Sequence, residues 1–133
     1  MQRIEHIGIA VKDLAISIPL FEKLLNRQCY KTERVDSENV NTAFFQTGGA
    51  KIELLESTDA DGVITRYIEK RGEGIHHLAF EVSDIRAEMK RLADEGFILL
   101  NDTPKLGADN KLVCFLHPKS TNNILIELCM ENA

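Results

Sequence analysis

The sequence predicts an α+β fold built from two copies of one module that contains strands and a helix. The segment EHIGIAVKDL at 5–14 returns as HHLAFEVSDI at 76–85, and both run from a histidine through an alternating apolar stretch to an aspartate. The segment KIELL at 51–55 returns as LIELC at 125–129, in the same order and at almost the same spacing. Two recurrences in register make chance similarity a poor explanation and indicate a duplicated module.

The repeat sets the expected domain organisation. We expect a single domain over 1–133, because a chain of this length can bury one sizeable core. Module one covers about 1–56, a linker helix about 57–74, and module two about 75–133.

The first module begins with a strand that leads into a helix. The segment from Ile4 to Val11 alternates and is rich in β-branched residues, as is typical of a strand. Apolar residues at helical spacing from Leu14 to Leu25 indicate a helix. Pro19 has no amide hydrogen and is costly inside a helix, so we expect a late start, with Ser17 as N-cap and Pro19 in the first turn.

A glycine pair and an amphipathic segment follow the first helix. Gly48 and Gly49 separate the segments 41–47 and 51–56, which predicts a β-hairpin. The stretch 57–74 carries apolar residues spaced one helical turn apart, and we interpret it as the helical linker.

The second module repeats this plan. Ser83 or Asp84 is expected to cap a helix that runs to about Glu95 and is stopped by Gly96. The expected strands are 75–82, 112–117 and 124–129.

The composition is that of a globular domain with a modest negative charge. The formal net charge of −5 argues against a nucleic-acid-binding face. No apolar run reaches the roughly 18 residues that span a membrane, and the N-terminal segment lacks a signal-peptide pattern. The three cysteines are odd in number and widely spaced, so we expect free thiols in a reducing cytoplasm.

Two histidines and two glutamates hold equivalent places in the repeat. Because side chains alternate across a strand, His6 and His77 each share a face with small residues, while large apolar residues occupy the opposite face. Glu53 and Glu127 each lie within an apolar strand, where a carboxylate is costly unless it is paired or bound to a metal. The repeat therefore predicts that these four side chains bind one divalent first-row metal ion.

Plainer interpretations stand beside this one. A single strand histidine is more often structural than a ligand, and a single strand glutamate is often half-exposed or salt-bridged. We interpret His76 as a structural or ligand-supporting residue and His117 as a loop residue. Three lysines in the second module either lie on a solvated face or contact phosphates of a ligand, namely Lys105, Lys111 and Lys119. The glycine pair lies between strands, which excludes a glycine-rich nucleotide loop.

Several longer blocks, namely IEHIGIAVKDL, KIELLE, GEGIHHLAFEVSDI, DTPKLGADNKLVCFLHPKS and the closing LIEL, span nearly the whole chain. Through them the sequence resembles the vicinal oxygen chelate superfamily and, within it, the methylmalonyl-CoA epimerase family. GIHHLAFEV and FLHPKS followed by LIEL are the more specific to the epimerases. The resemblance implies two βαβββ modules that form a cup-shaped, mixed eight-stranded sheet around a divalent metal, in a homodimer.

By position, the resemblance implies His6, Glu53, His77 and Glu127 as ligands, with Co²⁺ as the expected ion and Mn²⁺, Ni²⁺ or Zn²⁺ as alternatives. The implied reaction interconverts (2R)- and (2S)-methylmalonyl-CoA through a metal-stabilised enolate. Glu127 would be one acid/base group. Some family members carry a second glutamate where this sequence has Thr42, so Glu53, a water or another group must supply the second.

Two other functions remain open from the sequence. A glyoxalase I-like lactoylglutathione lyase uses the same His/Glu/His/Glu set, and a metal-free ligand-binding module shares the fold. The epimerase interpretation adds an acyl-CoA substrate, for which Lys111 and Lys119 are candidate contacts. It expects no nucleic-acid or membrane partner.

Overall fold

The computed structural model describes residues 1–133, which form two compact units. We call residues 6–76 the N-unit, and residues 1–5 with 77–133 the C-unit. The helices are α1 (Leu14–Leu25), α2 (Val63–Arg71) and α3 (Ile85–Asp94). The strands are β1 (Arg3–Ala10), β2 (Lys31–Val35), β3 (Val40–Thr47), β4 (Ala50–Ser57), β5 (Gly74–Glu81), β6 (Lys105–Leu106), β7 (Lys111–Leu116) and β8 (Ile126–Glu131). Three 3₁₀ turns, η1 (Asp36–Glu38), η2 (Ala108–Asn110) and η3 (Pro118–Ser120), complete the elements.

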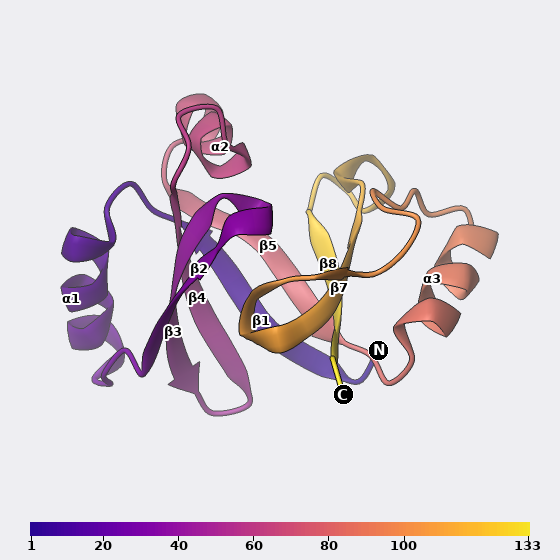
Figure 1. Cartoon of the computed structure of the whole chain (residues 1–133), viewed down its shortest axis with the longest axis horizontal. Helices are drawn as coiled ribbons and strands as arrows, with labels where there is room; N and C mark the ends of the chain where they lie inside the picture. The colour runs from indigo at the N-terminus through magenta and orange to yellow at the C-terminus, as the bar shows by residue number, and fades with distance from the viewer. The chain divides into compact units, whose positions relative to one another are not determined.

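The N-unit is a mixed sheet with one face covered by a helix. Its strands are ordered β2-β3-β4-β1, with β1 parallel to β4 and the other pairs antiparallel. The expected hairpin is confirmed, since β3 and β4 are joined at Gly48, which has a positive φ of 79°. Helix α1 lies beside β3 and β4 (Figure 1) and packs its apolar side on Ala43, Phe45 and Leu54.

Helix α1 begins earlier than the sequence analysis expected. Its N-cap is Asp13, whose carboxylate accepts from the backbone N–H of Ala15, and Ser17 lies inside the helix. The predicted late start is therefore wrong. Pro19 is tolerated in the helix interior, and it is exposed to solvent. The Asp13 cap and the packed apolar face offset the one backbone hydrogen bond that a proline cannot make.

The C-unit repeats the arrangement. Its strands are ordered β5-β8-β7-β6, with β5 parallel to β8 and the later pairs antiparallel. Helix α3 is capped by Asp84 rather than Ser83 and ends before Gly96, as expected. It buries Ile85 and Met89 against Leu128 and other apolar residues of β7 and β8.

The register of the two units is the same around one position. In the N-unit Gly8 of β1 pairs with Glu53 of β4, and in the C-unit Ala79 of β5 pairs with Glu127 of β8. Each glutamate thus lies opposite a small residue on the neighbouring parallel strand. On that neighbouring strand, the small residue comes two positions after the histidine. The small residue leaves space beside the carboxylate on that face.

Some boundaries differ from the expected ones. The linker 57–74 contains α2, as predicted, but β8 begins at Ile126 rather than at 124. Strands β2 and β6 have no counterpart among the strands inferred from the sequence pattern, because β2 is short and mostly polar and β6 has only two residues. No helix is both long and apolar enough to cross a membrane.

Candidate metal centre

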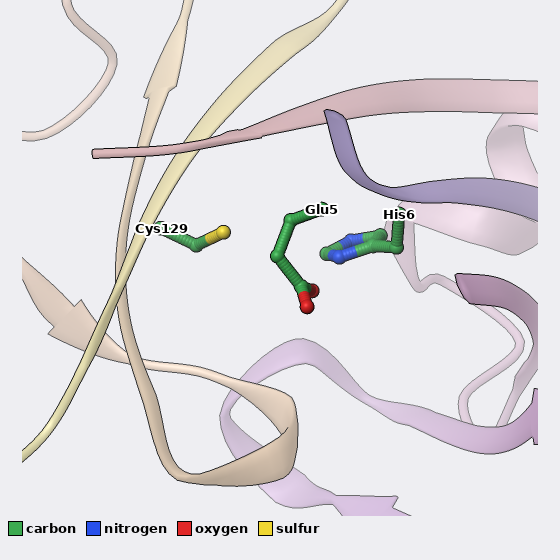
Figure 2. A group of neighbouring side chains, drawn as sticks. All are labelled: Glu5, His6 and Cys129. Carbon is green, nitrogen blue, oxygen red and sulfur yellow. The ribbon is translucent and has the colours of Figure 1, made fainter. Parts of the chain in front are cut away.

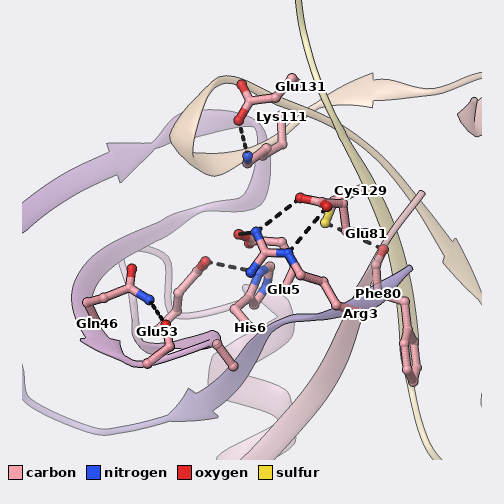
Figure 3. Close-up of polar contacts among 12 residues, drawn as sticks. Arg3, Glu5, His6, Gln46, Glu53, Phe80, Glu81, Lys111, Cys129 and Glu131 are labelled. Carbon is pink, nitrogen blue, oxygen red and sulfur yellow. Dashed lines mark hydrogen bonds and ion pairs between the residues drawn. The ribbon is translucent and has the colours of Figure 1, made fainter. Parts of the chain in front are cut away.

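The N-unit holds a buried histidine–glutamate pair. His6 Nδ1 lies 3.1 Å from an oxygen of Glu53, and the side chains are 5% and 4% exposed (Figure 3). The pair forms because β1 and β4 run parallel and place the two residues diagonally across the strand pair. A carboxylate this buried requires a partner of opposite charge or a metal ion.

The C-unit holds the equivalent pair. His77 Nε2 lies 3.2 Å from an oxygen of Glu127, with both side chains 6% exposed. The parallel β5 and β8 place His77 diagonally from Glu127, as in the N-unit. Each of the four residues that the sequence singled out is therefore buried and paired with the partner from its own module.

The donor set and its spacing fit a divalent first-row metal ion. Imidazole nitrogen and carboxylate oxygen bind such an ion at about 2.0–2.2 Å. Two donors at that distance stand about 3.0 Å apart at a right angle and about 3.4 Å apart at a tetrahedral angle, and the 3.1 Å and 3.2 Å within the two pairs lie between these values. Mixed imidazole and carboxylate donors favour first-row metals over magnesium or calcium.

An aromatic ring lies opposite each glutamate. Phe44 of β3 pairs with Glu53, and Phe115 of β7 pairs with Glu127. The His77 ring meets Phe115 edge-on, with centroids 6.0 Å apart. The sequence analysis missed these rings, although aligning the strand before each glutamate strand would have revealed that both carry a phenylalanine at this register.

A lysine approaches the face of each ring. Lys31 Nζ lies 4.8 Å from the centroid of Phe44, and Lys105 Nζ lies 5.5 Å from that of Phe115. Lys31 also lies 3.5 Å from a Glu33 oxygen. These cation–π contacts place an ammonium over each of the two rings that lie opposite the glutamates.

A second acidic group, also missed by the sequence analysis, lies at the start of β1. Figure 2 shows the Cys129 thiol pointing toward Glu5, whose carboxylate is within 4.8 Å of Cys129 Sγ. The thiol donates to the Phe80 carbonyl at 3.5 Å, and an Arg3 nitrogen lies 4.0 Å from Glu5. The guanidinium also donates to both oxygens of Glu81, and this hydrogen bonding raises the pKa of Arg3 (Figure 3).

The expected substrate lysines differ in environment. Lys111 is 7% exposed and forms an ion pair with Glu131, which lies directly opposite on β8 (Figure 3). Lys119 is exposed on η3, and its backbone N–H donates to His117 Nδ1. His117 therefore caps a turn, which confirms its interpretation as a loop residue. His76 packs edge-on against Tyr67, with centroids 4.9 Å apart.

Thr42 is fully buried, and its hydroxyl has no hydrogen-bond partner. It pairs with Leu55, two positions along β4 from Glu53, and therefore shares a sheet face with that glutamate. The cysteines are free, as expected, and burial raises the pKa of the Cys114 thiol.

Comparison with protein families matches residues 5–115 to the model of the glyoxalase/bleomycin resistance protein/dioxygenase superfamily. The chain is 37% identical to the uncharacterized protein YqjC of Bacillus subtilis, over 97% of this chain and 92% of that protein. It is 36% identical to the ethylmalonyl-CoA/methylmalonyl-CoA epimerase of Cereibacter sphaeroides, over 95% of this chain and 96% of that enzyme.

The structure is also similar to solved epimerases. One methylmalonyl-CoA epimerase, in complex with methylmalonyl-CoA and NH₄⁺, superposes with a TM-score of 0.95 at 32% identity. The match covers 100% of this chain and 96% of the other. It confirms the predicted fold class, two βαβββ modules in a mixed eight-stranded sheet.

Proposed function

Because the chain belongs to the glyoxalase/bleomycin resistance protein/dioxygenase superfamily, we propose that it is an epimerase of this superfamily, acting on methylmalonyl-CoA. The observation that carries the proposal is that each unit presents a buried His–Glu pair at the same strand register, in a chain that matches such epimerases over nearly its full length. The reaction would interconvert the (2R) and (2S) forms of the thioester.

His6, Glu53, His77 and Glu127 are the residues that would hold a divalent metal, and superfamily membership supports this. When bound, such an ion supplies Lewis-acid stabilisation of the negative charge that develops on the oxygens flanking C2. The donor set suits Co²⁺, our first choice, as well as Mn²⁺, Ni²⁺ and Zn²⁺. The buried surroundings strengthen that electrostatic stabilisation by excluding water.

Inversion at C2 requires a proton to leave one face of the carbon and to return on the other. We assign Glu127 and Glu53 as the two acid/base groups, one from each module. A carboxylate can accept the C2 proton once the enolate charge is stabilised. Thr42 is not a base, because a hydroxyl does not ionise near neutral pH without an activating partner.

The remaining assignments follow from the substrate class. The acyl-CoA carries phosphates, and Lys119, exposed on η3, is a candidate contact for them. Lys111, already paired with Glu131, would contact substrate only by exchanging that partner. We also propose a homodimer in the cytoplasm, consistent with free thiols.

The reaction is tested with a single epimer of methylmalonyl-CoA in deuterated water, using protein loaded with Co²⁺ and following C2 by NMR. We expect deuterium at C2 together with formation of the other epimer. Absence of both, with metal bound, would refute the proposal. A parallel assay with methylglyoxal and glutathione separates it from a glyoxalase activity, because only a lyase forms lactoylglutathione.

A further inference from the structure

Thr42 carries a buried hydroxyl that the fold does not use. Its side chain is 0% exposed, and Oγ1 lacks any hydrogen-bond partner. Valine has almost the same shape and suits a strand as well, so packing gives no reason for a hydroxyl here. An orphaned polar atom in a protein interior points to a water or ligand that completes it.

Two apolar residues and two glutamates are among the neighbours of Thr42 on its sheet face. Phe44, two residues along β3, is fully buried, and Leu55, directly opposite on β4, is nearly so. Glu53 lies diagonally across the strand pair, where Cα atoms stand about 7–8 Å apart. Since no hydrogen bond joins Thr42 to Glu53, the space between them suits one small bridging group.

Glu33 is the polar neighbour on the other side. It pairs with Thr42 across β2 and β3, but its carboxylate lies 3.5 Å from Lys31 Nζ. Thr42 makes no hydrogen bond to it. On the β4 side of Thr42, the polar group that shares its sheet face is Glu53, which is paired with His6.

We propose that Thr42 positions a water molecule that carries the proton between C2 of the acyl-CoA substrate and Glu53. This inference rests on the proposed function. Thr42 Oγ1–H donates to the water oxygen, and the water donates one of its hydrogens to the Glu53 carboxylate. As the C2–H bond breaks, its electron pair stays on the enolate, its proton goes to the water, and the water passes its own proton to Glu53. Proton return reverses these transfers.

Thr42 acts through the water and is therefore a positioning residue. Its role predicts an effect on one proton transfer only, the one assigned to Glu53. Removal of a proton by Glu127 and its return to the same face leave the configuration unchanged and need no help from Thr42. The ratio of inversion to deuterium exchange with retention therefore reports the Thr42 water directly.

The test compares the wild type with Thr42→Val and Thr42→Ser, each loaded with Co²⁺, on a single epimer in deuterated water. Thr32→Val is the matched control, because Thr32 is exposed and pairs with Ala43 on the same sheet. The epimer used is the one whose exchange at C2 is lost in Glu127→Gln, so that Glu127 removes its proton. With this epimer we expect Thr42→Val to lower inversion by about 10- to 100-fold relative to exchange with retention. Thr42→Ser and Thr32→Val should keep the wild-type ratio.

Melting temperatures guard against a folding artefact, since Thr42→Val should melt no lower than the wild type. A wild-type ratio in Thr42→Val, or failure of Thr42→Ser to restore it, would overturn the inference and leave the proposed function intact. Equal losses of inversion and exchange in Thr42→Val would overturn it as well. A wild type that neither exchanges nor inverts refutes the proposed function, and the inference falls with it.

Discussion

Glu53 and Glu127 are charged residues at buried strand positions, where apolar side chains are normally favoured. Apolar residues flank both, and both are nearly fully buried beside a histidine of a parallel strand. Sequence alone could identify them, because the repeat places the same unfavourable residue twice at the same point. Their partners His6 and His77 were identified in the same way.

Replacing Glu127 separates a catalytic role from a structural one. Glu127→Gln keeps the shape of the side chain but removes its charge and its basicity. Because inversion needs both acid/base groups, we expect inversion at C2 to fall by at least about 100-fold, measured by NMR with Co²⁺ present. Glu69→Gln is the control, because Glu69 is exposed on α2 and has no place in the proposed site. Equal activity in the two variants would exclude Glu127 from the chemistry.

Thr42 also makes a prediction about stability. A buried hydroxyl without a partner costs free energy, so Thr42→Val should raise the free energy of unfolding by about 1 kcal/mol, or roughly 3–5 °C in Tm. Urea titration of the metal-free protein measures it. A loss of stability of similar size would mean that the hydroxyl makes a structural hydrogen bond.

Helix α1 shows where element-level prediction fails. Pro19 suggested a start near Ser17, yet Asp13 caps the helix, and the backbone N–H of Leu14 donates to Glu56 of β4 at 2.9 Å. The contact between Leu14 and Glu56 joins residues far apart in the sequence, so no local sequence pattern could predict it. The short strands β2 and β6 were missed because a few polar residues carry no clear alternation.

The position of the cap can be measured. Asp13→Ala removes the side chain that accepts from Ala15, and it should lower the free energy of unfolding by about 1 kcal/mol. Ser17→Ala should have a smaller effect, because Ser17 lies within the helix. Chemical denaturation measures the free energy of unfolding of both variants and shows which residue caps the helix. The reverse order of effects would place the start of α1 at Ser17.

Helix α3 contains a carboxylate whose protonation affects stability. Hydrogen bonding from Arg91, together with the N-terminal ammonium of Met1 at 3.2 Å, lowers the pKa of Glu88. A lowered native pKa stabilises the fold above the ordinary value of the unfolded chain, and this contribution is lost as the pH falls through the native value.

We therefore expect the free energy of unfolding of the wild type to fall more steeply with acid than that of Glu88→Gln. Urea titrations over a series of pH values, from neutral to below the ordinary carboxyl range, compare the two slopes. Glu95→Gln, at the C-cap of the same helix, serves as the control. If the free energy of unfolding depends on pH in the same way in the wild type and in Glu88→Gln, the ion pairs of Glu88 do not contribute to stability.

At the scale of the whole molecule, duplication explains both the success and the limits of prediction. The His–Glu pairs and their strands follow from residues that recur in the sequence. Phe44 and Phe115 recur too, but nine residues separate Phe44 from Glu53 and twelve separate Phe115 from Glu127, so their equivalence appears only when the strands are aligned by register. Thr42 has no polar counterpart in the other unit, since the residue at the equivalent register is Val113, opposite Cys129. No repeat could therefore have identified it.

The proposal that His6, Glu53, His77 and Glu127 hold one ion predicts a particular stoichiometry. Titration of the metal-free protein with Co²⁺, followed by calorimetry and visible absorption, should give one ion per chain in the wild type. His6→Ala and His77→Ala should each lose that tight binding, because one shared ion needs both modules. Two ions in the wild type, with one retained in each variant, would contradict the account.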